Sequence, residues 1–402
     1  MHTSLQTLQG STRLLFDSVE GITNKVERMH QTIARVPLPF APPPQQPSRA
    51  HGLIAAGVYH MIRGVNASLR EGVDRSFTAL PSDQHLAASR AGETRAIAAL
   101  NGVCGDHLEA TNNPLALAMS LRTAEGALDL GADSLAAALP QASPHIVILV
   151  HGLSLSELCW KRGGEAGIGE LLQAELGFTP LYLRYNSGRH ISANGRQFAQ
   201  LLQALCERWP TTVESITLVG HSMGGLVIRS ACCYAQRSGD EWLQHLQKVI
   251  CLGTPHHGSP LEKAGHAFET AMQRIPYLEP MLFGKMRSVG IKDLRHGSLL
   301  DEDWQGHDPD GSGPDRRKVV PMVPGVQYFF AAASVGRDHS DPLGLLLGDL
   351  LVRPDSAVGT HKNALRKLKI DPENCRVFHE KNHFDLLSDS RVQQQVIDWC
   401  SN

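Results

Sequence analysis

The stretch SITLVGHSMGGLVIR, residues 215–229, decides the fold of this chain. Residues 216–219 form a short, largely β-branched run of the kind that fills a buried parallel strand. Three glycines then flank a single serine, Ser222, and an apolar pattern resumes directly after them. A serine on a sharp turn between a strand and a helix is typical of a nucleophile elbow, in which the hydroxyl stands clear of the sheet edge.

Small residues are needed two positions before and after Ser222, because the strand and the helix pass close to each other there. Gly220 and Gly224 meet this need. The helix that follows also directs free N–H groups and the positive end of its dipole towards the reacting atom. The pattern Gly-His-Ser-Met-Gly-Gly resembles the lipase, esterase and PGAP1-like branch of the α/β-hydrolase superfamily, and the resemblance covers about residues 100–402.

The segments around the elbow follow the order that this fold requires. Apolar runs predict further strands at 145–153, 180–185, 248–253, 326–333 and 375–378. Helices are predicted between them at about 169–176 and 194–208. Strict alternation from Leu115 to Leu121 predicts a β-hairpin at about 104–122 that opens the sheet. Strands that alternate with helices require a mainly parallel sheet with helices on both faces.

The N-terminal part of the chain carries long helical patterns. Residues 12–36 place apolar side chains at alternating spacings of four and three, which predicts a narrow stripe and a helix-pairing seam. A proline-rich connector at 37–47 precedes a second helix at about 53–73, and a third helix is considered at 83–100. We expect a hairpin packed on the hydrolase domain, with binding to a partner or a membrane surface as the alternative. The apolar stripes comprise Leu15, Val19, Ile22, Val26, Met29, Ile33 and Val36 in the first helix, and Ile54, Val58, Met61, Val65 and Leu69 in the second.

Residues 1–95 are therefore predicted to form a helical accessory region, and residues 96–402 an α/β-hydrolase catalytic domain. An insertion at about 260–320 interrupts that domain between two predicted strands. It opens with apolar residues at near-helical spacing and continues into a polar run rich in Gly, Pro and Asp at 301–318. We interpret the insertion as a helical lid followed by a mobile loop, and an ordinary surface insertion is the alternative.

Ester hydrolysis by a serine requires a nucleophile, a base, an acid that orients the base, and donors for the oxyanion. Ser222 is the predicted nucleophile, and the N–H of Met223, first in the helix, is one predicted oxyanion donor. The N–H of Leu153 is the second, because its loop follows the strand beside the elbow and His151-Gly152 resembles the family's His-Gly motif. His151 precedes the serine, whereas this fold uses the order serine, acid, histidine, so we interpret it as structural.

The resemblance also implies the base. The segment His-Phe-Asp-Leu-Leu at 383–387 follows the last predicted strand and resembles the family's terminal histidine segment, which makes His383 the base. His379 is the competitor. It lies where the strand ends and is expected to pack against the sheet.

The acid is implied in the same way. Residues 348–352 resemble the family's Gly-Asp-Gly-x-Val segment, which makes Asp349 the acid. The chain departs from that pattern at Leu350, where the family has glycine. Asp341 and Asp355 stand nearby, so both remain alternatives.

Composition restricts the class of protein. The chain has 402 residues and a net charge of −2, and its Lys and Arg residues are dispersed, so we expect no nucleic-acid binding. No apolar run approaches the roughly 18 residues of a membrane span, and the N-terminus lacks the pattern of a secretory signal. Eight scattered cysteines without metal-ligand spacing suggest reduced thiols and a cytoplasmic location, with peripheral membrane contact left open. We interpret the paired His256-His257 as loop structure and expect no metal.

The sequence thus predicts a serine hydrolase of the lipase and esterase type that acts on carboxylic esters through Ser222, His383 and Asp349 and needs no cofactor. An acyltransferase or a lipid-glycan deacylase would use the same residues. A catalytically silent scaffold that acts through the N-terminal helices is the alternative from another class. The natural ester or lipid substrate and the oligomeric state are left open.

Overall fold

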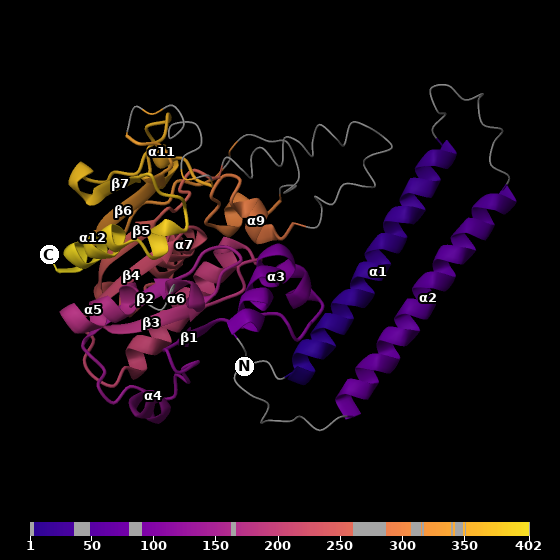
Figure 1. Ribbon diagram of the computed structural model, residues 1–402, viewed down its shortest axis with the longest axis horizontal. Coiled ribbons are helices and arrows are strands. Elements are labelled where there is room, and N and C mark those ends of the chain that lie inside the picture. The colour runs from indigo at the N-terminus through magenta and orange to yellow at the C-terminus, as the bar shows by residue number, and fades with distance from the viewer. Residues whose placement is uncertain are drawn as a thin grey trace. The chain divides into compact units, whose positions relative to one another are not determined.

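The computed structural model describes most of the chain, which forms two compact units (Figure 1). The first unit comprises Met1–Arg90, His107–Ala116 and Gly265–Arg287, and the second comprises Ala91–Asp106, Leu117–Ala264 and Ser288–Asn402. The predicted domain boundary at residue 95 stays a prediction. The described residues are 4–35, 49–79, 91–161, 166–259, 287–306, 315, 317–338, 341, 349 and 351–401.

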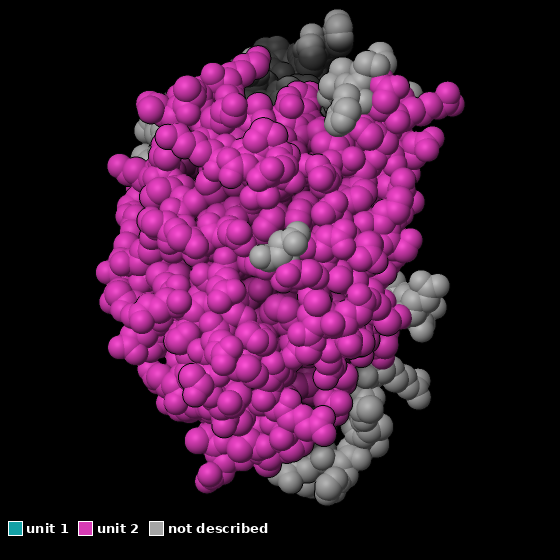
Figure 2. Space-filling view, turned by 90° about the vertical axis from the view of Figure 1, so that its left-hand side faces the viewer, with its two compact units in different colours: residues 1–90, 107–116, 265–287 teal, residues 91–106, 117–264, 288–402 magenta. Residues whose placement is uncertain are grey.

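The second unit, whose surface faces the viewer in Figure 2, is built on a seven-stranded sheet. The strand order is β1-β3-β2-β4-β5-β6-β7, with β1 antiparallel to β3 and every other pair parallel. The mainly parallel sheet that the sequence predicts is therefore confirmed, and the predicted strand ends differ by up to three residues. The strands are β1 Ser120–Arg122, β2 His145–Val150, β3 Thr179–Arg184, β4 Ser215–His221, β5 Leu246–Leu252, β6 Gln327–Ser334 and β7 Cys375–His379.

Helices cover both faces of this sheet, because successive side chains of a buried strand point to opposite sides. Ile146 and Ile148 of β2 pack with residues of α6 and α7, whereas Val147 and Leu149 pack with residues of α5 and α12. The helices of this unit are α4 Ala132–Ala138, α5 Ile168–Leu176, α6 Ile191–Arg208, α7 Met223–Ser238, α9 Val289–Asp293, α11 Pro354–Ala357 and α12 Ser390–Ser401. Short 3-10 helices occupy Glu157–Trp160, Glu241–Gln244, Asp301–Asp303, Pro372–Asn374 and Asp385–Leu387.

The β-hairpin predicted at 104–122 is wrong. Residues Ala91–Ala110 form helix α3, which is kinked at Cys104, and the third helix considered at 83–100 is described from Ala91 onwards. Turns follow the helix up to residue 116, and residues 117–119 have no ladder partner before β1. Side chains bind their backbone instead: Leu117 N–H donates to Asn101 Oδ1 at 2.9 Å. Alternation indicates an extended chain with one buried side, and it does not specify a strand partner.

The first unit contains a helical hairpin of α1 (Ser4–Arg35) and α2 (Arg49–Ala79), which lie side by side (Figure 1). The predicted apolar pairing seam is wrong where the side chains are described, since Leu15 is 62% exposed and Leu69 is 56% exposed. Polar contacts join the helices instead. They are the ion pairs Arg13–Asp74 at 2.6 Å, Arg63–Glu27 at 2.5 Å and Arg70–Asp17, and the bond from Asn66 Nδ2 to Phe16 O at 3.0 Å. An apolar stripe shows that a helix face favours burial, but not which surface covers it.

Much of the predicted lid insertion lies outside the described residues, including 260–286 and 307–314. The described residues of the insertion are 287–306, 315 and 317–320. Of these, 287–306 contain α9 and contribute the buried Leu299 and Leu300 to the core of the second unit. Among the helices that the structure describes, none is both long and apolar enough to cross a membrane.

Candidate active site

Ser222 lies on the turn between β4 and α7, with φ 54° and ψ −123°, a backbone conformation that residues with a side chain rarely adopt. The strand and the helix leave no room for larger neighbours. A Cβ at Gly224 would lie 2.2 Å from Val150 O, and one at Gly220 would lie 2.5 Å from Gly225 N. The Ser222 N–H donates to Leu252 O at 2.8 Å, which ties the turn to β5.

The turn lies at the point where the strand order reverses. The chain leaves β2 for β3 on one side and later enters β4 on the other side, which opens a crevice beyond the carboxyl ends of β2 and β4. The loops after these two strands meet there. A Cβ at Gly152 would lie 3.0 Å from Ser222 Cβ. The fold therefore brings the loop of Leu153 to the serine.

His383 and Asp349 form a buried pair. His383 Nδ1 lies 2.6 Å from Asp349 Oδ2, and the two residues are 2% and 1% exposed. The other carboxylate oxygen, Oδ1, accepts from Leu351 N–H at 3.0 Å and from Val352 N–H at 2.7 Å. These bonds fix the carboxylate so that the imidazole keeps one orientation. His383 Nε2 is buried and bonds to no described residue, so this nitrogen is available for a reacting group.

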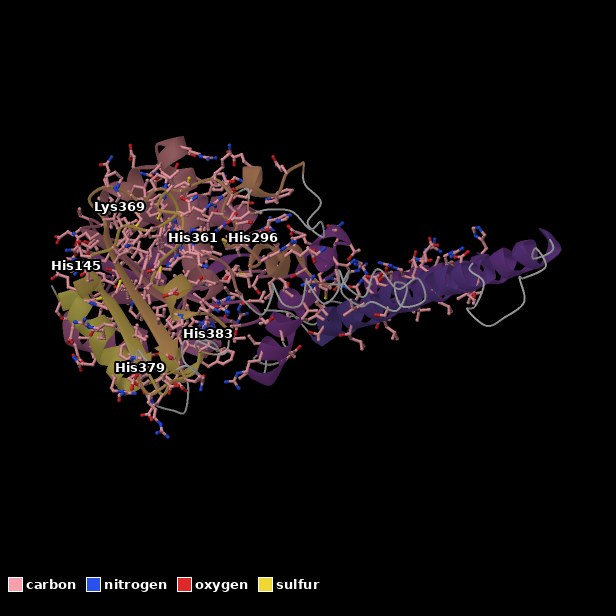
Figure 3. The ribbon with its side chains drawn as sticks, turned by 90° about the horizontal axis from the view of Figure 1, so that it is seen from above. His145, His296, His361, Lys369, His379 and His383 are labelled. Atoms are coloured by element: carbon pink, nitrogen blue, oxygen red, sulfur yellow. The ribbon has the colours of Figure 1, made fainter. Side chains whose placement is uncertain are left out.

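The alternative residues lie in different surroundings. Asp355 is exposed in the short helix α11, and Asp341 Oδ2 accepts from Arg337 N–H at 3.0 Å. His379 ends β7, and Figure 3 shows it apart from His383 in the C-terminal segment. Leu350 lies outside the described residues.

A cavity of about 170 Å³ opens beside the serine and the histidine. Ser222, His221 and His383 supply polar groups to its wall, together with Ser259. The rest of the wall is apolar. It consists of Gly152, Leu153, Leu155, Pro255, Ile291, Leu294, Leu351, Val352 and Phe384. The structure thus brings together the predicted nucleophile, the predicted base and the loop of one predicted oxyanion donor.

The loop of Leu153 rests on His151. The Nδ1–H of His151 donates to Gly152 O at 2.8 Å, and its Nε2 accepts from Tyr185 N–H at 3.4 Å. The two rings stack at 4.3 Å, and the Tyr185 hydroxyl donates to His151 O at 2.8 Å. Burial lowers the pKa of His151 to about 4, so it stays neutral at pH 7. His151 supports the loop through its bond to Gly152 O and is not among the residues that line the cavity. Met223, the other predicted donor, is the first residue of α7, where an N–H has no acceptor within its helix.

His221 is a residue that sequence reasoning missed. It directly precedes the serine, is fully buried, and its Nε2–H donates to His383 O at 3.1 Å. The two imidazole rings lie 4.7 Å apart. The histidine of the Gly-His-Ser-Met-Gly-Gly motif could have drawn attention to this position. Its role was not predictable, because its partner lies 162 residues further along the chain. His221 positions the loop that carries His383.

The paired histidines brace a loop. His256 is buried against Phe330, with ring centroids 4.3 Å apart, and its Nδ1 faces the buried Arg229 at 3.4 Å. Burial and then the Arg229 charge lower the pKa of His256 well below its usual value. His257 Nε2 donates to Gly359 O at 3.1 Å. Within the described ranges, no group of three or more metal-binding side chains gathers here or elsewhere.

The mainly parallel sheet, the serine on the turn after β4 and the buried histidine–carboxylate pair together have the architecture of the α/β-hydrolase fold. Residues 141–312 match the family described as PGAP1-like alpha/beta domain. No curated protein matches the chain.

Several solved structures are similar to this chain. The mature lipase BlEst2 of Bacillus licheniformis is 18% identical, with a TM-score of 0.39, and the match covers 65% of this chain and 92% of that one. A lipase-esterase related protein from Clostridium acetobutylicum is 16% identical (TM-score 0.35; 65% and 94% covered). The esterase Pf2001 of Pyrococcus furiosus is 12% identical (TM-score 0.37; 70% and 88% covered).

Proposed function

We propose that this protein hydrolyses carboxylic esters through an acyl-enzyme formed on Ser222. The observation that carries the proposal is the buried pair of His383 and Asp349, beside a cavity that both His383 and Ser222 line. The Nε2 atom of His383 bonds to no described residue. A strained serine beside a fixed histidine–carboxylate pair is the arrangement that activates a hydroxyl for acyl transfer.

In the first half of the reaction, Ser222 Oγ attacks the acyl carbon and its proton passes to His383 Nε2. Asp349 keeps the Nδ1 proton in place and stabilises the imidazolium that forms. The N–H groups of Leu153 and Met223 receive the negative charge that develops on the acyl oxygen, and each such donor contributes about 100- to 1000-fold to turnover. His383 then protonates the leaving alcohol as the ester C–O bond breaks.

In the second half, water attacks the acyl-enzyme. His383 takes a proton from the water and returns one to Ser222 Oγ as the free acid leaves, which restores the starting state. An alcohol in place of water would make the same site an acyltransferase, and an acylated lipid-linked glycan as substrate would make it a deacylase. The three activities would use the same site residues. The acyltransferase would differ in the group that accepts the acyl chain, and the deacylase would differ in the alcohol part of the substrate.

The proposal also covers the substrate class, the cellular location and the N-terminal region. We propose an ester or lipid substrate, a cytoplasmic location with peripheral membrane contact left open, and an accessory role for residues 1–95. The branch of the superfamily to which residues 141–312 are similar supports the first of these.

The test is covalent labelling by a fluorophosphonate together with hydrolysis of an aryl acetate. Ser222→Ala is expected to lose both, whereas Ser238→Ala, on the exposed end of the same helix, keeps both. Far-UV circular dichroism shows whether each variant is folded. Labelling of Ser222→Ala at the wild-type rate would refute the nucleophile, and a wild-type protein that neither labels nor hydrolyses any ester would favour the scaffold.

A further inference from the structure

The cavity beside Ser222 is small. Its volume of about 170 Å³ is close to that of an engineered cavity of about 150 Å³, lined by Leu, Ile and Phe, that binds benzene in another protein. Benzene has six carbon atoms. A straight fatty acyl chain of twelve or more carbons would extend far beyond such a space.

The wall of the cavity is apolar. Apart from His221 and His383, no ionisable side chain among the described residues lines it. A carboxylate or ammonium group inside would lose its hydration and would meet no Asp, Glu, Lys or Arg side chain to pair with, which is costly. A compact apolar group would instead replace water on the leucine and isoleucine surface at a gain of about 0.8 kcal/mol for each methylene buried.

We propose that the protein acts on esters that place a compact, uncharged apolar group of up to about six carbons in this cavity. The inference rests on the proposed function and narrows its substrate class from esters in general to short ones. The group is either the acyl chain or the alcohol, and the two arms of the experiment below distinguish them.

One wall of the cavity is held in place by other elements, so it does not yield easily to a longer chain. Helix α9, which carries Ile291, is anchored at its start, where Ser288 Oγ donates to Gly102 O at 2.6 Å. Val289 N–H donates to Asp106 at 3.0 Å. At the other end, Leu294 O accepts from Ser259 N–H at 2.9 Å.

Another part of the wall adjoins the acid. Leu351 and Val352 line the cavity, and their N–H groups bind Asp349. A substitution there would disturb the histidine–carboxylate pair. The Ile291 and Leu294 side chains line the cavity and are aliphatic, so they make no hydrogen bonds. The cavity can therefore be enlarged or filled at these two positions without touching the catalytic groups.

The experiment measures kcat/KM for two series of esters below the concentration at which they aggregate. One series holds the alcohol constant and lengthens the acyl chain from two to sixteen carbons, and the other holds an acetyl group constant and lengthens the alcohol. In one series kcat/KM should rise by about fourfold for each methylene that fits, up to about six carbons. It should then fall at least tenfold by ten carbons. The series that shows this limit identifies the group that the cavity binds.

Two variants test the wall itself. Leu294→Ala should move the limit to longer chains, and Ile291→Phe should move it to shorter ones. The matched control is Leu299→Ala, because Leu299 belongs to the same core cluster and is similarly buried, at 5% against 8% for Leu294, but does not line the cavity. It should lose stability in the same way and keep the wild-type limit. If Leu294→Ala does not fold, the shift of the limit is measured with Ile291→Phe alone, at a residue that is only half-buried.

Equal or rising kcat/KM from two to sixteen carbons in both series would overturn this inference, as would a limit that neither cavity variant moves. Fluorophosphonate labelling is measured beside it. A labelled serine with a preference for long chains refutes the cavity proposal alone, whereas an unlabelled protein refutes the proposed function.

Discussion

Replacement of Asp349 by asparagine tests the candidate site at its most buried contact. Asp349 Oδ1 accepts two backbone N–H groups, at 3.0 and 2.7 Å, and Oδ2 lies 2.6 Å from His383 Nδ1. In Asp349→Asn the amide oxygen keeps the place of Oδ1, because only an oxygen accepts those two bonds. The amide NH₂ is then directed at His383 Nδ1.

A donor at that position reverses the tautomer of the histidine. Nδ1 must accept, so the proton moves to Nε2, and Nε2 can no longer take the proton of Ser222. In a serine hydrolase a change of this kind lowers turnover by about ten-thousand-fold, which corresponds to about 5 kcal/mol of barrier. The backbone bonds survive, so the fold should be nearly unchanged.

The assay is turnover of a short aryl ester, with thermal unfolding measured on the same samples. Asp355→Asn and Asp341→Asn are the controls, and each should stay within about tenfold of the wild-type rate, or about 1.4 kcal/mol of barrier. Near-normal turnover of Asp349→Asn beside a crippled Asp355→Asn would refute the reasoning and move the acid to position 355. Loss of structure in Asp349→Asn would show that the amide does not keep the two backbone bonds.

Three further predictions concern stability and organisation. Burial lowers the pKa of His151 to about 4, so below its unfolded pKa of about 6.5 the unfolded chain binds a proton that the folded chain does not. His151 should therefore contribute a loss of stability of up to about 3 kcal/mol between about pH 6.5 and 4. Over this range the urea midpoint of His151→Phe should fall less than that of the wild type, and equal slopes would contradict the prediction. Gly224→Ala would place a methyl group 2.2 Å from Val150 O and should prevent folding or lower the Tm by several degrees, whereas Gly92→Ala, with open space around it, should not; equal Tm values would be inconsistent with the close approach. If residues 1–95 are accessory, a chain that begins at Ala91, where α3 starts, should keep fluorophosphonate labelling, and its loss would assign the N-terminal helices to the site's support.

Much of the fold could be predicted from local sequence patterns. The strands on both sides of Ser222 were predictable because a buried parallel strand needs a continuous apolar run, and helices between such runs require a parallel sheet. The turn at Ser222 was predictable because the strand and the helix leave room only for glycine at positions 220 and 224. Both features depend on residues only a few positions apart.

Other predictions failed where a local pattern has more than one three-dimensional outcome. The alternation around Leu117 belongs to a segment without a ladder partner whose backbone binds the Asn101 side chain, and helix α3 occupies the first part of the predicted hairpin, up to Ala110. The stripe that includes Leu15 marks an apolar helix face, yet α1 meets α2 through ion pairs such as Arg13–Asp74. Periodicity defines a face, and tertiary packing decides what meets it.

The sequence by itself determined the type of sheet, the serine on its turn and a short set of candidates for the other roles. Only the tertiary structure decided which candidate meets which: Asp349 rather than Asp341 or Asp355 contacts His383, and His221 holds the loop of His383 from 162 positions away. The size of the cavity likewise depends on α9 and the segment after Asp349, which lie far apart in the chain. Such contacts form between segments that the sheet brings together, so no pattern of neighbouring residues encodes them.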